Sequence, residues 1–200
     1  MNNYIDYVMN NVTCRFESVA DHNLNDDRIS LNIPNTDLYI NFVIYENENT
    51  VNVLKNTVLK LLGISPEELL EIALSNTYIK EQPRFLDFER IMNIVDADAT
   101  IKDEIRNIII SNEKLYYGAI FILNKEIQEM LYRKLGDFYI LPSSVHEVIC
   151  IPKVDTDKEY LLKMVKEVNS EYFMTDIDIL TDDVFEIRDG KICSAFINSI

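Results

Sequence analysis

Residues 138–152 read FYILPSSVHEVICIP, in which two runs rich in β-branched and aromatic residues flank a Pro-Ser-Ser turn. Such runs on either side of turn-forming residues are typical of a β-hairpin, so we expect strands at residues 137–141 and 146–151. The stretch also carries His146, one of the two histidines of the chain. It therefore predicts a fold element and offers a first candidate for a functional side chain.

Other segments have strand patterns bounded by turn residues. Pro34-Asn35 and Asp189-Gly190 each separate two of them, and Asp-Gly tolerates the positive φ values that a two-residue hairpin turn needs. An Asn-Glu-Lys turn separates another two. The expected strands are residues 28–31, 38–45, 107–111, 116–123, 184–188 and 191–193.

Helices are expected where apolar residues recur at steps of three and four. Ser65 and Glu68 form a capping-box pattern with Pro66 at the first helical position, and Thr156 with Glu159 forms a second. In the helix after Thr156, the apolar stripe includes Tyr160 and Val168. The expected helices are residues 50–63, the segment that begins at Ser65, and residues 85–95, 124–136 and 156–170.

Strands joined by hairpins and separated by single helices predict an α+β fold, with two layers and a mainly antiparallel sheet that has helices packed on one face. A hydrophobic content of 48% is enough for a sizeable core. Residues 29–200 are expected to form a single α+β domain. Residues 1–28 are rich in Asn and Asp and are expected to be an irregular lead-in.

The chain is strongly acidic. It has 34 acidic and 19 basic residues, a formal net charge of −15, which opposes direct binding to a nucleic acid. This charge suits a protein partner with a basic surface, although solubility alone explains it equally well. We find no signal segment and no apolar run of membrane-spanning length, so we expect a cytoplasmic chain without membrane contact.

Cofactor and metal sites are not signalled. The chain has four glycines, and neither GxGxxG nor GxxxxGK[ST] occurs, so no nucleotide cofactor is expected. Cys14, Cys150 and Cys193 are widely spaced, which predicts neither disulfides nor a zinc site, and the last two are expected inside the sheet. His22 and His146 alone do not make a metal site.

The Pro-Ser-Ser turn allows one enzymatic interpretation, with Ser143 or Ser144 as nucleophile and His146 as general base. Ser144 and His146 lie two apart, so on an extended backbone they share a face. No strand-to-helix elbow, oxyanion-hole glycine or orienting acid accompanies them, and serines in such turns ordinarily bond to nearby backbone. His146 itself is either a hairpin side chain bonded to backbone or to a carboxylate, or a pH-sensitive or ligand-contacting group.

Residues 171–190, EYFMTDIDILTDDVFEIRDG, combine seven acids with one arginine and several apolar side chains. The acids lack the glycine and terminal glutamate spacing of a calcium loop. A mixed anionic and apolar strip is what a docking surface for a basic partner needs, and a solvated rim is the alternative. The candidate partner-binding residues are Asp176, Asp178, Asp182, Asp183, Glu186 and Phe185.

Four stretches, residues 62–77, 115–131, 137–152 and 161–169, resemble an uncharacterised bacterial family of unknown function that carries an LPSS-[IV]-HEV hairpin motif. The resemblance covers most of residues 30–193, and the chain looks like an N-terminally shortened member. The resemblance implies the same order of strands and helices but no activity.

The sequence therefore favours a non-enzymatic protein-interaction module, in one form an acidic inhibitor that occludes a basic, nucleic-acid-binding protein. The alternative is a hydrolase that uses Ser144 and His146 at the LPSS turn.

Overall fold

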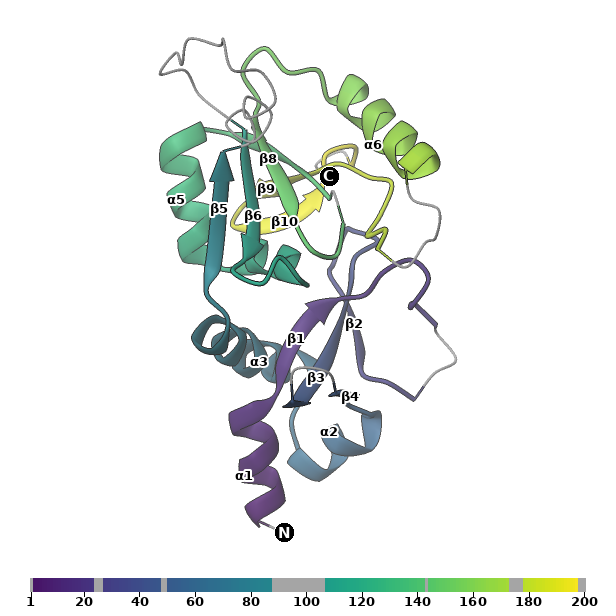
Figure 1. Cartoon of the computed structure of the whole chain (residues 1–200), viewed down its shortest axis with the longest axis vertical. Coiled ribbons are helices and arrows are strands. Elements are labelled where there is room, and N and C mark those ends of the chain that lie inside the picture. Colours follow the sequence, from purple (N-terminus) through teal and green to yellow (C-terminus); the bar gives the residue numbers. More distant parts are fainter. Residues whose placement is uncertain are drawn as a thin grey trace.

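The computed structural model describes residues 2–23, 27–47, 50–87, 107–142, 144–172 and 178–197 and has two antiparallel β-sheets with associated helices (Figure 1). The predicted α+β class is confirmed. The elements are α1 (Asn2–Asn11), β1 (Thr13–Phe16), β2 (Ser30–Asn32), β3 (Tyr39–Asn47), β4 (Thr50–Val53), α2 (Asn56–Leu62), α3 (Pro66–Lys80), β5 (Pro83–Asp87), β6 (Ile108–Asn112), η1 (Gly118–Leu123), α5 (Lys125–Leu135), β7 (Phe138–Leu141), β8 (Val148–Pro152), α6 (Lys158–Tyr172), β9 (Phe185–Arg188) and β10 (Lys191–Ser194).

The first sheet is built around β3, which pairs with β1, β2 and β4. The β1–β3 register sets Cys14 opposite Phe42 and Arg15 opposite Asn41. Because side chains alternate along a strand, the first pair belongs to one face and the second pair to the other. Cys14 and Phe42 lie in the hydrophobic core, whereas Arg15 and Asn41 make the opposite face polar.

The second sheet has the strand order β10-β9-β7-β8-β6-β5. In its central hairpin, Ile140 pairs with Cys150 and Leu141 with Ile149, which confirms the hairpin predicted around the LPSS turn. Ile140 and Cys150 belong to the main core cluster, and Leu141 packs with Leu161 of α6 in a smaller cluster. Helices therefore cover both faces of this sheet, so the prediction of helices on one face is wrong for it. Figure 1 shows α5 and α6 on opposite sides of the sheet.

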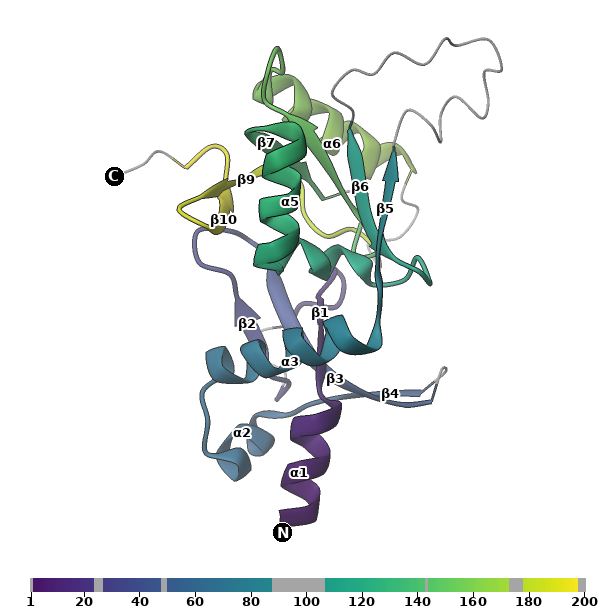
Figure 2. The same ribbon diagram turned by 90° about the vertical axis from the view of Figure 1, so that its left-hand side faces the viewer.

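The two sheets share one hydrophobic core. The main cluster of buried residues runs from Val8 in α1 through Phe42 in β3 to Ile110, Ile140 and Ile192 in the second sheet. Figure 2 shows α3 and η1 at the level where the two sheets meet. Tyr78 of α3 and Phe121 of η1 make a tilted ring contact there, with centroids 6.0 Å apart.

Several local sequence signals are confirmed. Ser65 accepts the Glu68 N–H at 3.2 Å, and the Glu68 carboxylate accepts the Ser65 N–H at 2.8 Å, which completes the capping box of α3. Gly63 ends α2 with a left-handed φ of 69°. Asn124 caps α5 through the N–H groups of Glu126 and Ile127. Asp189 and Gly190 have φ values of 49° and 70°, as a two-residue hairpin turn requires.

Four predicted elements differ from the structure. Residues 50–53 begin the expected helix 50–63 but form β4, and residues 85–87 of the expected helix 85–95 belong to β5; the remainder of that helix lies outside the described residues. Residues 118–123, predicted as strand, form the 3₁₀ helix η1. The expected irregular lead-in instead contains α1 and β1, and β1 joins the first sheet. All four errors concern short segments whose secondary structure depends on the residues that they pack against.

The start and inner face of α6 also differ from the prediction. Asp157, not Thr156, caps the helix, because its carboxylate accepts the Glu159 N–H at 2.9 Å. Thr156 instead donates its hydroxyl to the Pro152 carbonyl at 2.7 Å. Tyr160 and Val168 were expected on the buried stripe but are exposed.

No helix in the described part of the chain has the length and apolar character needed to cross a membrane.

Candidate functional site

The LPSS turn does not form a nucleophile–base pair between Ser144 and His146. Ser144 is buried, and its hydroxyl oxygen accepts the backbone N–H of His146 at 3.1 Å. Its own N–H donates to the Glu147 carbonyl at 3.2 Å. Ser144 thus stabilises the turn, which is the ordinary role of serine in such a segment. Ser143 lies outside the described residues.

Both ring nitrogens of His146 have partners. Nδ1 accepts the backbone N–H of Tyr117 at 3.0 Å, so in this arrangement Nδ1 carries no proton. Nε2 then holds the ring proton and donates it to Asp178 Oδ1 at 3.1 Å. The sequence around His146 offers no acid to orient it, because Asp178 is distant in the chain. Asp178 supplies that partner, but no ring nitrogen is left to take a proton from Ser144.

The His146 ring is also held by aromatic contacts. Tyr116 stacks on it with centroids 5.0 Å apart, and Tyr117 meets it edge-on at 5.4 Å. The His146 carbonyl accepts the Ser111 hydroxyl at 2.8 Å and the Gly118 N–H at 3.0 Å. His146 therefore joins β6, η1 and the LPSS turn as a structural residue.

Arg15 of β1 extends the cluster of contacts around His146 to the first sheet. Its guanidinium carbon lies 4.1 Å from the centroid of the Tyr117 ring, and its Nε donates to Asn41 Oδ1 at 3.3 Å. Arg15 is only 9% exposed, and no described carboxylate makes an ion pair with it. Burial raises the pKa of Tyr117 to about 12, and the charge of Arg15 opposes that rise. Asn41 Nδ2 is buried without a hydrogen-bond partner. No pattern in the sequence indicated the contacts of Arg15 with Tyr117 and Asn41.

The acidic segment from Asp178 to Asp183 is fixed at both ends. At its start, the Val145 N–H donates to the Asp178 carbonyl at 3.0 Å, next to the His146–Asp178 contact. Near its end, the Asn169 amide of α6 donates to the Thr181 carbonyl at 3.1 Å and to Asp182 Oδ1 at 2.7 Å. The LPSS turn and α6 thus hold this segment in one conformation.

Three carboxylates meet at a surface groove of about 570 Å³ next to this segment. Asp182 and Asp183 come from the acidic segment, and Asp37 comes from the turn before β3. Burial raises the pKa of Asp37, the hydrogen bond from Thr181 opposes this rise, and the charges of Asp183 and Asp182 add to it. We call these three residues with Leu162 and Phe196 the acidic groove; Asn35, Thr36, Lys166, Ser194 and Ile197 complete its lining.

Two predicted partner-binding residues lie inside the fold. Phe185 is 1% exposed and belongs to the main core cluster, because β9 pairs with β7 and β10. Glu186 is 6% exposed, and its carboxylate pairs with Lys153 and Arg188. Neither side chain belongs to an exposed strip, so the prediction of a continuous surface was wrong at these two positions. Asp176 lies outside the described residues.

The three cysteines are buried and free, as expected for Cys150 and Cys193. Burial raises the pKa of the Cys14 thiol to about 12, and it also raises the pKa of the Cys150 thiol. His22 Nδ1 lies 2.8 Å from Glu17 Oε2, and the His22 ring stacks on the ring of Tyr39. Within the described ranges, no three His, Cys, Asp or Glu side chains are grouped to hold a metal ion.

Comparison with protein families gives one match. A model described as "Family of unknown function (DUF5688)" matches residues 30–188. The chain belongs to this family. The DUF5688 match includes the LPSS turn, Asn169 and the three aspartates of the groove, and it agrees with the resemblance to an uncharacterised family. A search of curated proteins found no match, and a search of solved structures found none either.

Proposed function

We propose that the protein is a non-enzymatic interaction module that binds a basic segment of another protein in the acidic groove. The observation that carries this proposal is the convergence of Asp37, Asp182 and Asp183 on one groove with apolar walls. Arginine and lysine have a charged head on an apolar stem, so a groove of carboxylates beside Leu162 and Phe196 is chemically complementary to them.

The partner fits the charge of the whole molecule. A net charge of −15 attracts a basic surface at long range and repels phosphate groups. In its finer form, the proposal makes the protein an inhibitor that covers the basic surface of a nucleic-acid-binding protein. Charge is the only support for that finer form.

Neighbouring groups hold the groove carboxylates in place for a basic side chain. Thr181, Asn169 and backbone groups position the three carboxylates, and the charges of Asp182 and Asp183 raise the pKa of Asp37. Bringing like charges together costs free energy that a bound cation would recover. Lys166 also lines the groove, and no ion pair joins it to the three aspartates in the described structure.

The geometry does not favour the alternative hydrolase. His146 has no ring nitrogen available for Ser144, because Tyr117 and Asp178 occupy both. We therefore expect a Ser144→Ala, His146→Ala variant to retain binding of a basic peptide once it is folded.

The direct test measures binding of a fluorescent arginine–leucine peptide by anisotropy. The variant Asp182→Asn, Asp183→Asn removes two charges but keeps the acceptor oxygens for Asn169 and Val184. We expect it to weaken binding by about tenfold, and the charge-reversing Asp182→Lys, Asp183→Lys variant to weaken it more. Affinity of the unmodified protein should also fall between about 50 mM and about 300 mM salt.

The matched control is Glu71→Gln with Glu113→Gln, which removes the same charge from exposed positions outside the groove. This control should retain most of the affinity. Equal losses in the control and the groove variant would mean that only net charge matters, and they would contradict the proposed site.

A further inference from the structure

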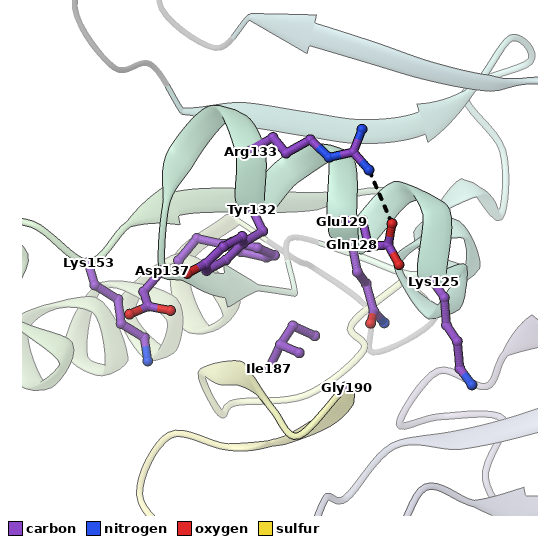
Figure 3. Close-up of a pocket in the computed structure, with 10 residues that line it drawn as sticks. Lys125, Gln128, Glu129, Tyr132, Arg133, Asp137, Lys153, Ile187 and Gly190 are labelled. Atoms are coloured by element: carbon purple, nitrogen blue, oxygen red, sulfur yellow. Dashed lines mark hydrogen bonds and ion pairs between the residues drawn. The ribbon is translucent and has the colours of Figure 1, made fainter.

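A second cavity, of about 360 Å³, lies between α5 and the β9–β10 hairpin (Figure 3). This volume falls in the range of about 300–1,000 Å³ that small-molecule sites usually have. The helix contributes Lys125, Gln128, Glu129, Tyr132 and Arg133, which share one helical face. The rest of the lining is Asp137, Phe138, Lys153, Ile187 and Gly190.

Part of the lining of this pocket is apolar. Phe138 is a buried lining residue, Ile187 projects from β9, and the ring of Tyr132 lies on the α5 side. Gly190 adds no side chain, so the hairpin turn leaves the space open. A flat hydrocarbon group, such as a phenyl ring, would therefore contact apolar surface on more than one side.

The polar groups around this apolar surface favour a negative charge at one end. Arg133 is paired with Glu129 at 3.2 Å, and Lys153 is paired with the buried Glu186. Lys125 has no ion pair with any described carboxylate, and Figure 3 shows its side chain at the Gln128 end of the pocket, away from Asp137 and Lys153. Lys125 is thus the lining cation left for a ligand.

Gln128 supplies a fixed polar group next to Lys125. It is 8% exposed, and its Nε2 donates to the Ile122 carbonyl at 2.8 Å, which fixes the direction of the amide. Nε2 has a second hydrogen and Oε1 is a further acceptor, and both remain for a bound polar group. Lys125 and Gln128 together can hold a carboxylate at one end of an apolar slot.

We propose that this pocket binds a small aromatic carboxylate, with its ring against Phe138, Ile187 and Tyr132 and its carboxylate at Lys125 and Gln128. In a chain with 34 acids and 19 bases, this lining has three basic and two acidic residues. Glu186, which pairs with Lys153, balances the third basic residue. The preference for a carboxylate therefore depends on Lys125, which Figure 3 shows away from Asp137. The proposal is independent of the acidic groove, with which it shares no lining residue.

The test follows amide resonances of the full chain by ¹H–¹⁵N NMR during titration with phenylpropionate. The uncharged phenylpropionamide and the cationic phenylpropylamine are compared at equal concentration. We expect phenylpropionate to shift the Gly190 and Gln128 signals and to bind at least about fivefold more tightly than the amide. Stronger binding of the amine, or no shift at Gly190 and Gln128, would overturn the proposal.

Lys125→Gln should remove the preference for the carboxylate while leaving weak binding of all three probes. Lys134→Gln is the matched control, because Lys134 is exposed on the same helix but does not line the pocket. An unchanged preference in Lys125→Gln would overturn the assigned role of Lys125. Binding of the arginine–leucine peptide should be the same in both variants, so this test and that of the acidic groove can fail separately.

Discussion

At the scale of single residues, His146 illustrates what a sequence can predict about a side chain. The chain has two histidines, and the β-turn pattern places this one in a hairpin, where bonding to backbone or to a carboxylate was one of its expected roles. The structure confirms that role through Tyr117 and Asp178. Neither partner could be predicted, because each approaches only after η1 and the acidic segment have packed against the turn.

Glu81 provides a pH-dependent prediction at this scale. Burial raises the pKa of Glu81, while the hydrogen bond from Asn112, at 2.7 Å, and the charge of Lys114 oppose the rise. The folded state therefore holds the Glu81 proton more tightly than the unfolded state does. The free energy of unfolding therefore falls as the pH rises from the ordinary pKa of a glutamate, which applies to the unfolded state, through the raised pKa of Glu81 in the folded state.

Glu81→Gln keeps an acceptor for Asn112 and removes the charge, so we expect it to raise the free energy of unfolding at neutral pH. The gain should shrink as the pH falls and vanish where Glu81 is protonated in both states. Urea unfolding of both proteins from neutral to acid pH measures this. Glu71→Gln on the exposed side of α3 is the matched control for the loss of one charge. A gain that is independent of pH would contradict the explanation.

At the scale of elements, sequence patterns correctly predicted those helix ends and turns that depend on neighbouring residues in the chain. The capping box at Ser65, the stop at Gly63 and the Asp189-Gly190 turn each depend on residues within a few positions of one another. The apolar run at residues 116–123 was misassigned, because a short buried strand and a short buried helix have the same composition. The structure places Gly118, the first residue of the 3₁₀ helix, in close contact with the backbone of β6, a contact that no local pattern reveals.

Gly118→Ala should therefore be strongly destabilising. A Cβ at this position would lie 2.4 Å from the backbone nitrogen of Asn112, and backbone cannot move aside as a flexible side chain can. We expect a loss of at least about 2 kcal/mol in the free energy of unfolding, measured with urea.

Gly63→Ala is the comparison for Gly118→Ala, because its Cβ would meet nothing within 4 Å but its φ of 69° is left-handed. That variant should lose only about 1 kcal/mol, which is the cost of the left-handed conformation. Similar losses in the two variants would show that steric crowding at Gly118 is not the cause.

At the scale of the whole molecule, a continuous core joins the two sheets and brings distant acids to one groove. Composition alone predicted Asp182 and Asp183 as partner-binding residues, and both line that groove. Asp37 was missed because it is isolated in the sequence and reaches the groove only through the fold. Phe185 and Glu186 were wrongly placed at the surface, because β9 is buried on both faces at these positions and Glu186 is paired there with Lys153 and Arg188.

Chemical-shift mapping locates the surface that binds a basic peptide and so tests the acidic groove. A ¹⁵N-labelled sample of the full chain is titrated with the arginine–leucine peptide, and the shifted amide signals are located in the structure. The groove account predicts the largest shifts at residues 35–37, 182–183 and 196–197. Shifts centred on the exposed acids of α3, or spread evenly over the acidic surface, would contradict it.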